Sequence, residues 1–277
     1  MIPFSGRCPF RQYVPSKPNP LGLKNFVMAA ADGLVLDFLI YVGEGTVRED
    51  DMKQLGLGAS VVEKLVETVK RSDPTFVFTD SFKLGDYLLE KNMFLTGTAI
   101  ANRTGGVAAT MPQDESMQRR QSHCNVRTDE KMCVVKWKDT KSVLLLSSAF
   151  GTEPEGKCRR WEKDEKKKVD VTQPDVVKKY NANMGGVDLI DRYISYYRIS
   201  LRTRKWTVRV FAHFLDLACC NSWIEYQRDC ERALTPKKER LDLLEFKSNI
   251  ANVFLKADTG RQPRSSQRLK SSQHRVQ

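Results

Sequence analysis

The amino-acid sequence predicts an α/β fold in which helices flank a mixed sheet. Apolar and β-branched runs predict strands at residues 23–31, 34–42, 75–79 and 94–101. Apolar residues at helical spacing predict helices at 59–71 and 82–91. The resulting order, strand, strand, helix, strand, helix, strand, is typical of a sheet that packs helices on its faces. A chain of 277 residues is long enough to bury a sizeable core.

Local signals define the borders of these elements. Residues 1–20 are rich in proline and basic groups and predict an extended lead-in. Asp32-Gly33 separates the first two strands and tolerates the positive φ angles of a tight turn, which predicts a hairpin. Asp73-Pro74 ends the first helix. The third strand ends at Asp80.

The composition changes after residue 103, and residues 104–173 predict an inserted subdomain. Glycine, proline, glutamine and charged residues dominate there, interrupted by strand-like runs at 132–137 and 142–150. The run 157–168 mixes both signs of charge and is interpreted as a solvated loop.

The C-terminal part predicts helices. One opens at Pro174, is interrupted at Gly185-Gly186 and resumes at Val187. Residues 207–230 carry apolar side chains on two faces, which predicts a mostly buried helix, and another helix follows near 241–255. The tail 259–277 has no acidic residue and should be disordered. The expected organisation is a first core part (1–103), the inserted subdomain (104–173), the last core helices (174–230), a C-terminal helix (231–258) and the tail (259–277).

The charge balance favours a polyanionic partner. Lys and Arg total 46 against 34 Asp and Glu, for a formal net charge of +12. Neutralising phosphates releases counterions, so nucleic acid is the expected partner. A solvated basic surface is the alternative. No run of about 20 apolar residues indicates a membrane span, and no membrane or small-molecule partner is expected.

The cysteines and histidines give little support to a disulfide framework, a metal site or a histidine-based catalytic site. Seven cysteines without a CxxC spacing fit free thiols in a reducing compartment better than disulfides or structural zinc. The three histidines are dispersed.

Four segments, in order and spacing, resemble the piggyBac transposase family. They are residues 3–18 (PFSGRCPFRQYVPSKP), 79–82 (TDSF), 97–103 (GTAIANR) and 180–191 (YNANMGGVDLID). Residues 204–206 (RKW) and Asn221-Ser222 continue the resemblance, which extends from residue 1 to about residue 231.

This resemblance implies an RNase H-like core that cuts and joins DNA. Three aspartates of the family hold two Mg²⁺ ions for an in-line displacement at a phosphodiester. Asp80 matches the second aspartate, Asp188 the third, and Asp191 a further one nearby, so these three are the candidate catalytic and metal residues. Taken singly, Asp80 is better explained as a strand-end turn residue and Asp188 as a helix N-cap. The surrounding family pattern favours the active-site interpretation of both.

The family's first aspartate has no counterpart in this sequence. It lies a few residues before the Pro-Phe-x-Gly-Arg segment, at the end of the first core strand, whereas Met1 falls after that point. Neither Asp32 in the hairpin turn nor Asp37 in the following strand replaces it. The first core strand is therefore expected to be missing, which would leave unpaired strand edges and a gap in the core. The family's N-terminal region and C-terminal zinc module are missing as well.

We expect a transposase-derived, nuclear protein that binds double-stranded DNA as a homodimer and is catalytically inactive as it stands. The alternatives are an active three-aspartate DNA transposase with an incomplete gene model, and a non-catalytic interaction protein or relic. DNA contact is expected from a basic connection with aromatic neighbours, or else this is simply a helix connection with a charged solvent face. Its residues are Arg198, Arg202, Arg204, Lys205, Trp206 and Arg209.

Overall fold

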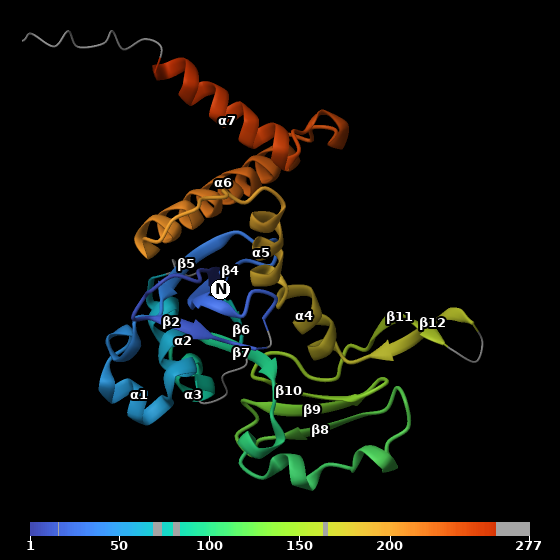
Figure 1. Ribbon diagram of the computed structural model, residues 1–277. Coiled ribbons are helices and arrows are strands. Elements are labelled where there is room, and N and C mark those ends of the chain that lie inside the picture. The colour runs from blue at the N-terminus through green and yellow to red at the C-terminus, as the bar shows by residue number, and fades with distance from the viewer. Residues whose placement is uncertain (16, 69–73, 80–83, 163–165, 259–277) are drawn as a thin grey trace, which may run out of the picture. The chain divides into compact units, whose positions relative to one another are not determined.

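The computed structural model describes residues 1–15, 17–68, 74–79, 84–162 and 166–258 (Figure 1). The chain divides into two compact units, residues 1–224 and 225–277, and each is described by itself. None of the helices in the described part of the chain is long and apolar enough to cross a membrane.

A five-stranded mixed sheet is the centre of the first unit. Its strand order is β6-β7-β10-β9-β8. β6 and β7 are parallel and are connected through α3, whereas the other neighbours are antiparallel. The bounds are β6 (Thr75–Phe78), α3 (Gly85–Glu90), β7 (Met93–Thr98), β8 (Ser122–Val126), β9 (Cys133–Lys138) and β10 (Ser142–Ser147).

Helices pack on both faces of this sheet. On one face, Leu88 of α3 and Val66 of α2 (Leu57–Thr68) pack with Leu95 of β7. On the other face, Val176 of α4 (Asp175–Asn183) packs with Leu145 of β10. The parallel strand pair and its two helix layers agree with the α/β fold predicted from the strand and helix order.

A hairpin and a small sheet complete the N-terminal part. β4 (Asn25–Ala29) and β5 (Val35–Ile40) pair antiparallel, and Gly33 takes a φ of 95° in the turn, as the Asp32-Gly33 dipeptide predicts. Residues 1–23 are not merely an extended lead-in, because they form a three-stranded sheet. Its strands, in the order β1-β3-β2, are β1 (Ile2–Pro3), β2 (Arg11–Tyr13) and β3 (Leu21–Leu23). α1 (Glu49–Leu55) was not predicted.

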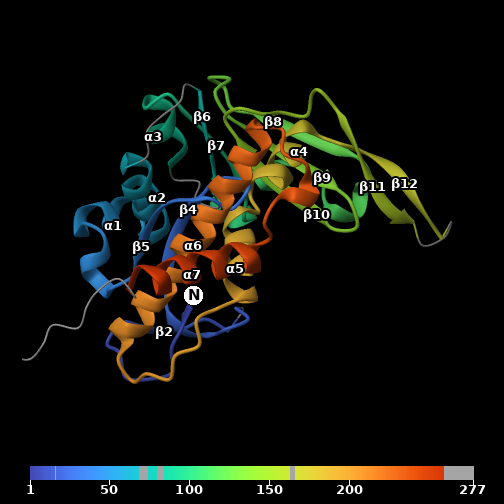
Figure 2. The ribbon, with the colours of Figure 1, turned by 90° about the horizontal axis from the view of Figure 1, so that it is seen from above.

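The segment 104–173 is more closely integrated into the sheet than an inserted subdomain suggests. β10 pairs directly with β7, so β8, β9 and β10 extend the sheet that β6 begins. β11 (Gly156–Glu162) and β12 (Lys167–Gln173) form a separate two-stranded ribbon. The interpretation of residues 157–168 as a solvated loop is therefore wrong for the described residues. In Figures 1 and 2 this ribbon extends away from the sheet.

The helices after Pro174 follow the predicted order. α4 is followed by α5 (Gly186–Tyr196) and α6 (Trp206–Arg232), and the second unit holds α7 (Leu243–Asp258). Short 3-10 turns lie at Gly43–Thr46, Ala101–Arg103, Val107–Thr110, Asp114–Ser116 and Lys237–Glu239. The tail 259–277 lies outside the described residues.

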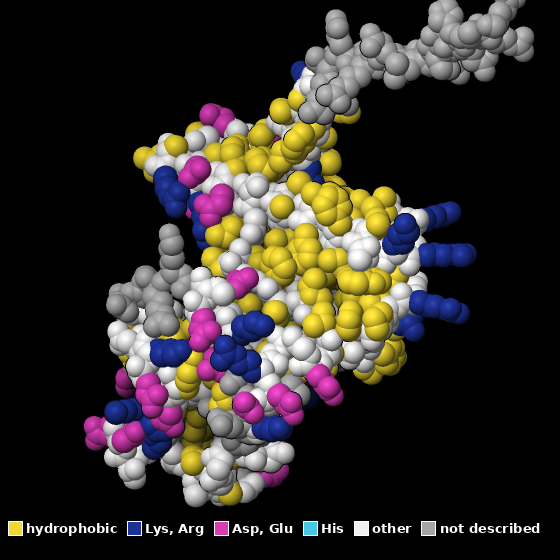
Figure 3. Space-filling view, turned by 90° about the vertical axis from the view of Figure 1, so that its left-hand side faces the viewer, with side chains coloured by type: hydrophobic (Ala, Val, Ile, Leu, Met, Phe, Trp, Pro, Cys, Tyr) yellow, Lys and Arg dark blue, Asp and Glu magenta, His cyan; other side chains and the backbone are white. Residues whose placement is uncertain are grey.

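The prediction that the helix over 207–230 is mostly buried is wrong for one of its two apolar faces. Ala212, Leu217 and Cys220 are buried, but Phe211 and Leu215 on the other face are exposed. Figure 3 shows a broad hydrophobic area on one side of the molecule, with Lys and Arg at its edge. The periodicity of an apolar stripe does not distinguish a stripe covered by the same chain from one left open.

Candidate active-site groove and nucleic-acid interface

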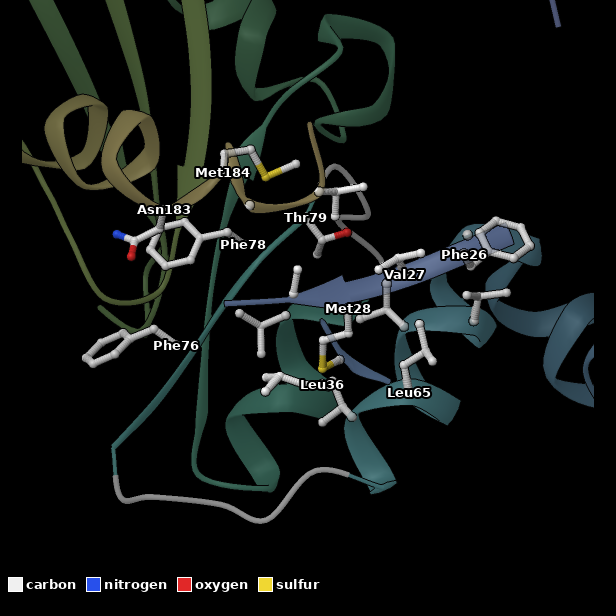
Figure 4. A pocket seen from close by; sticks show the side chains of 18 of the residues that line it. Phe26, Val27, Met28, Leu36, Leu65, Phe76, Phe78, Thr79, Asn183 and Met184 are labelled. Atoms are coloured by element: carbon white, nitrogen blue, oxygen red, sulfur yellow. The ribbon is translucent and has the colours of Figure 1, made fainter. Parts of the chain in front are cut away.

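A groove of about 1,700 Å³ lies between the hairpin and the five-stranded sheet. One side is formed by β4 and the other by β6, and α2 contributes Val62, Leu65 and Val66. Figure 4 shows Val27 and Met28 of β4 together with Phe76 and Phe78 of β6 around this space. Its volume exceeds the range of about 300–1,000 Å³ that is usual for small-molecule pockets.

Both strands that border the groove are edge strands within the described part of the chain. β4 pairs with β5 alone, and β6 pairs with β7 alone. One backbone edge of each strand therefore has no strand partner there. At one side of the groove Phe76 stacks on Phe150, with ring centroids 5.2 Å apart, and the Lys179 ammonium lies 5.4 Å from the centre of the Phe150 ring.

Polar side chains gather where the groove meets α4 and α5. Thr79, Asn102, Asn183 and Asp188 line it there. Asp188 reaches the groove from the first turn of α5, where its negative charge suits the helix N-terminus. Among the described residues that line the groove, Asp188 is the one carboxylate.

A close backbone contact places the start of α5 against the hairpin turn. A Cβ on Gly186 would lie 2.1 Å from the carbonyl oxygen of Ala30, a distance that no real side chain accepts. The Gly185-Gly186 dipeptide therefore interrupts the helix and also lets α5 approach the hairpin. This contact holds Asp188 next to the open edge of β4.

The three candidate aspartates differ in what the structure shows of them. Asp188 is exposed and lines the groove. Asp191 is exposed one turn further along α5 and is not part of the groove's described lining. Asp80 lies outside the described residues, but its neighbour Thr79 lines the groove together with Asp188.

The donor atoms at this end suit a hard cation only in part. Carboxylate, amide and hydroxyl oxygens are the ligand types that Mg²⁺ accepts. Within the described ranges, however, no group of three or more His, Cys, Asp or Glu comes together as a metal site. Asp188 alone does not supply the carboxylates that a two-ion centre needs.

The basic connection between α5 and α6 contains both exposed and inward-facing side chains. Arg202, Arg204 and Lys205 are exposed, as are the rings of Tyr196 and Tyr197. Trp206 instead packs edge-on against Phe10, at a centroid distance of 6.2 Å, beside the core of the small sheet. Of the six predicted contact residues, three therefore face solvent.

Arg198 and Arg209 line a narrow crevice with His213 and Asp216. The Nε of Arg209 is buried and has no hydrogen-bond partner among the described residues. Burial, and secondarily the charge of Arg198, lowers the pKa of His213 to about 4. The backbone N–H of Ile199 donates to Asp216 at 2.8 Å, which fixes the connection to α6.

Two groups of residues were missed by sequence reasoning. Asn102 and Asn183 lie within segments that carry the family resemblance, but amides gave no signal of their own. Lys157, Arg159 and Trp161 form an exposed row on β11. In the sequence this run mixes charged, apolar and aromatic side chains without a regular alternation, so it gave no signal of an exposed row.

Comparison with known proteins identifies the family. A family model described as transposase IS4 matches residues 1–223. Human piggyBac transposable element-derived protein 2 is 30% identical over 280 residues, an alignment that covers 98% of this chain. The chain belongs to the piggyBac transposase family.

Other relatives agree with this assignment. Human piggyBac transposable element-derived protein 3 is 29% identical over 92% of the chain. The fold is similar to a cryo-electron microscopy structure of the piggyBac transposase synaptic complex with hairpin DNA, with a TM-score of 0.71 and 23% identity over 94% of this chain. The chain spans 46% and 42% of the two human proteins and 52% of the solved chain, about half of each.

Proposed function

We propose that this chain is a piggyBac transposase-derived DNA-binding protein, and that residues 1–277 do not cut DNA by themselves. The observation that carries the proposal is the groove between β4 and β6, at whose polar end Asp188 is the one described carboxylate. Family membership makes DNA the natural partner, and the solved relative is a transposase complex with hairpin DNA.

The volume of the groove is large enough to hold one additional β-strand. Six residues at about 3.3 Å each, with a strand spacing near 4.8 Å and a sheet thickness near 10 Å, occupy about 1,000 Å³. A volume of about 1,700 Å³ therefore accommodates one strand with its side chains. Two open strand edges and an apolar floor support the proposal that the family's first core strand belongs here.

A strand in this position would end close to Asp188. A carboxylate at its end would then lie near Asp188 and Thr79, and the family resemblance assigns Asp80 as a further carboxylate of the centre. These residues would hold Mg²⁺, which supplies charge stabilisation and activation of the attacking oxygen when it is bound. Asp188 would orient such an ion from a helix end that the Gly186 contact keeps in place. Without the strand, two aspartates are too few for a two-ion centre.

The same geometry favours a second candidate, an active DNA transposase that requires a further strand in the groove. The groove and Asp188 are retained, so an added strand that ends in Asp-Glu would complete the centre.

Placing such a segment of six to eight residues before Met1 should raise the free energy of unfolding, because it pairs both edges and covers Val27, Met28 and Leu65. A matched segment with charged residues in place of the apolar ones should not. Equal stability of the two extended chains would contradict a strand site in this groove.

DNA binding is tested by fluorescence anisotropy on labelled duplexes of unrelated sequence. The exposed cations and the net charge of +12 should give weak binding that falls steeply with salt and shows little sequence preference. An interaction that is absent at low salt would contradict the proposal and favour a relic or an interaction protein.

Nuclear localisation and a homodimer complete the proposal, since a DNA-binding transposase relative acts where chromosomal DNA lies. Microscopy of the tagged chain and sedimentation of the purified chain test these two points. Exclusion from the nucleus or a strictly monomeric state would contradict the respective point.

A further inference from the structure

The β11–β12 ribbon separates its side chains between two faces. In an antiparallel pair, directly opposed residues lie on the same face. Arg159 pairs with Asp170, and Trp161 pairs with Lys168, so these side chains share one face with that of Lys157. Cys158, Arg160, Glu162, Val169 and Val171 lie on the other face.

The second of these faces attaches the ribbon to the five-stranded sheet. Cys158, Val169 and Val171 pack against the core that contains Trp137 and Leu145. Two charged contacts lie further along the ribbon: the guanidinium of Arg160 donates to Asp139 at 2.9 Å, and that of Arg119 donates to Glu162 at 2.7 Å. The position of the ribbon is therefore determined by packing and ion pairs, and its opposite face is available.

That opposite face, here called the outer face, consists of Lys157, Arg159, Trp161, Lys168, Asp170 and Thr172. Trp161 is 56% exposed, although tryptophan is among the most buried residues on average. Arg159 and Asp170 approach only to 3.8 Å with both side chains largely exposed, so this pair leaves Arg159 able to bind elsewhere. Three cations around an exposed indole form a surface that is unusual for a solvated ribbon.

We propose that the outer face of the β11–β12 ribbon binds nucleic acid, with Trp161 stacking on an unstacked base and Lys157, Arg159 and Lys168 contacting phosphates. Lys157 and Arg159 lie two residues apart on β11, about 6.8 Å along the strand, so they can contact different phosphates of one DNA strand. Indole–base stacking tolerates any base sequence, and guanidinium groups bind phosphate oxygens in a forked geometry. The ribbon thus favours DNA with unpaired bases over blunt duplex.

This inference deepens the proposed function, since it rests on DNA as the partner. It adds a contact surface outside the groove and outside the basic connection. An acidic protein segment would satisfy the cations but would offer no base for Trp161. Polyglutamate therefore serves as the competitor that separates the two kinds of partner.

The test measures binding of the full chain to a forked DNA with single-stranded arms and to a blunt duplex of the same length. Trp161→Ala should weaken binding of the forked DNA by about 5- to 150-fold, the loss of one aromatic–base stack, and should affect the blunt duplex much less. Trp161→Phe should retain most of the affinity, because a phenyl ring still stacks. Tyr13→Ala, which removes another exposed aromatic ring, should have no such effect.

A second pair of variants isolates the phosphate contacts from net charge. Lys157→Ala with Lys168→Ala should lower the salt slope on single-stranded DNA by about 1.4, at about 0.7 per phosphate contact. Arg48→Ala with Lys53→Ala removes the same charge from exposed positions around α1 and should leave the slope nearly unchanged. Thermal unfolding should be similar for all variants, since none of these side chains belongs to the core.

Each outcome decides the proposal. Wild-type affinity of Trp161→Ala for forked DNA, with duplex binding intact, would overturn the ribbon site while the proposed function stands. Equal slopes for the two charge pairs would overturn the phosphate contacts, and polyglutamate competing as well as DNA would assign the surface to an acidic protein. No binding of any DNA at low salt would overturn both the ribbon site and the proposed function.

Discussion

Gly186 at the start of α5 and Ala30 in the β4–β5 turn meet so closely that a Cβ on Gly186 would lie 2.1 Å from the Ala30 carbonyl oxygen. This contact joins two segments more than 150 residues apart and positions Asp188 beside the groove. It makes Gly186 a structural requirement of the candidate site.

Gly186→Ala should lower the free energy of unfolding by about 1–3 kcal/mol, because the added methyl group forces the helix away from the hairpin. Urea denaturation followed by circular dichroism measures this. Gly185→Ala is the matched control, since a Cβ there meets no atom within 4 Å. Equal effects of the two substitutions would show that the contact with Ala30 does not constrain α5.

Asn221 of α6 stabilises the hairpin by bonding both backbone groups of Val35. Its Oδ1 accepts from the Val35 N–H at 3.0 Å, and its Nδ2 donates to the Val35 carbonyl at 2.9 Å. Asn221→Ala should cost about 2–4 kcal/mol of stability, because both groups lose their partner. The loss of stability for Asn221→Asp should lie between those of the wild type and Asn221→Ala, because aspartate keeps the hydrogen-bond acceptor and lacks the donor. Ser222→Ala, at an exposed neighbouring position, should be almost neutral in the same denaturation experiment.

The buried His213 should make stability depend on pH below neutrality. Its pKa is about 4, against an ordinary value of 6.5, because burial and Arg198, with the amino group of Met1, outweigh the attraction of Asp216. The unfolded chain therefore binds a proton between these values while the folded chain does not, and the free energy of unfolding falls as pH drops from about 6.5 to 4. The total is about 3 kcal/mol. His213→Gln should remove this component, and parallel stability curves for the two proteins would contradict it.

The exposed part of the basic connection should carry a share of DNA binding. Arg202→Ala with Arg204→Ala should lower the salt slope on duplex DNA by about 1.8, at about 0.9 per phosphate. Anisotropy titrations between low and moderate salt measure the slope. Arg48→Ala with Lys53→Ala again matches the loss of charge. If both pairs of substitutions lower the salt slope equally, Arg202 and Arg204 contribute only through the net charge of the protein and not through direct phosphate contacts.

The sequence predicted most elements of this fold because their signals are local. Asp32-Gly33 specified a hairpin turn, and Gly185-Gly186 specified the break between α4 and α5. Sheet membership was less accessible. The pairing of Leu145 in β10 with Thr98 in β7 joins strands 47 residues apart, and no local pattern in 104–173 reveals it.

The candidate site was predicted through resemblance and not through chemistry visible in single residues. Taken alone, Asp188 is better explained as a helix cap, and only its family context made it a candidate. The groove beside it depends on which strand edges remain open, a property of the whole sheet. The sequence did not single out Trp161, because it lies in a run that contains both signs of charge. Only the pairing of β11 with β12 shows which side chains share a face with Trp161.

Metal-dependent cleavage of a labelled hairpin DNA tests the central claim most directly. Residues 1–277 are incubated with Mg²⁺ or Mn²⁺ beside the same chain extended by an apolar strand that ends in Asp-Glu, and the products are resolved on a denaturing gel. We expect no product from residues 1–277, and product from the extended chain that Asp80→Ala or Asp188→Ala abolishes. Cleavage by residues 1–277 themselves, lost on Asp80→Ala, would contradict the account.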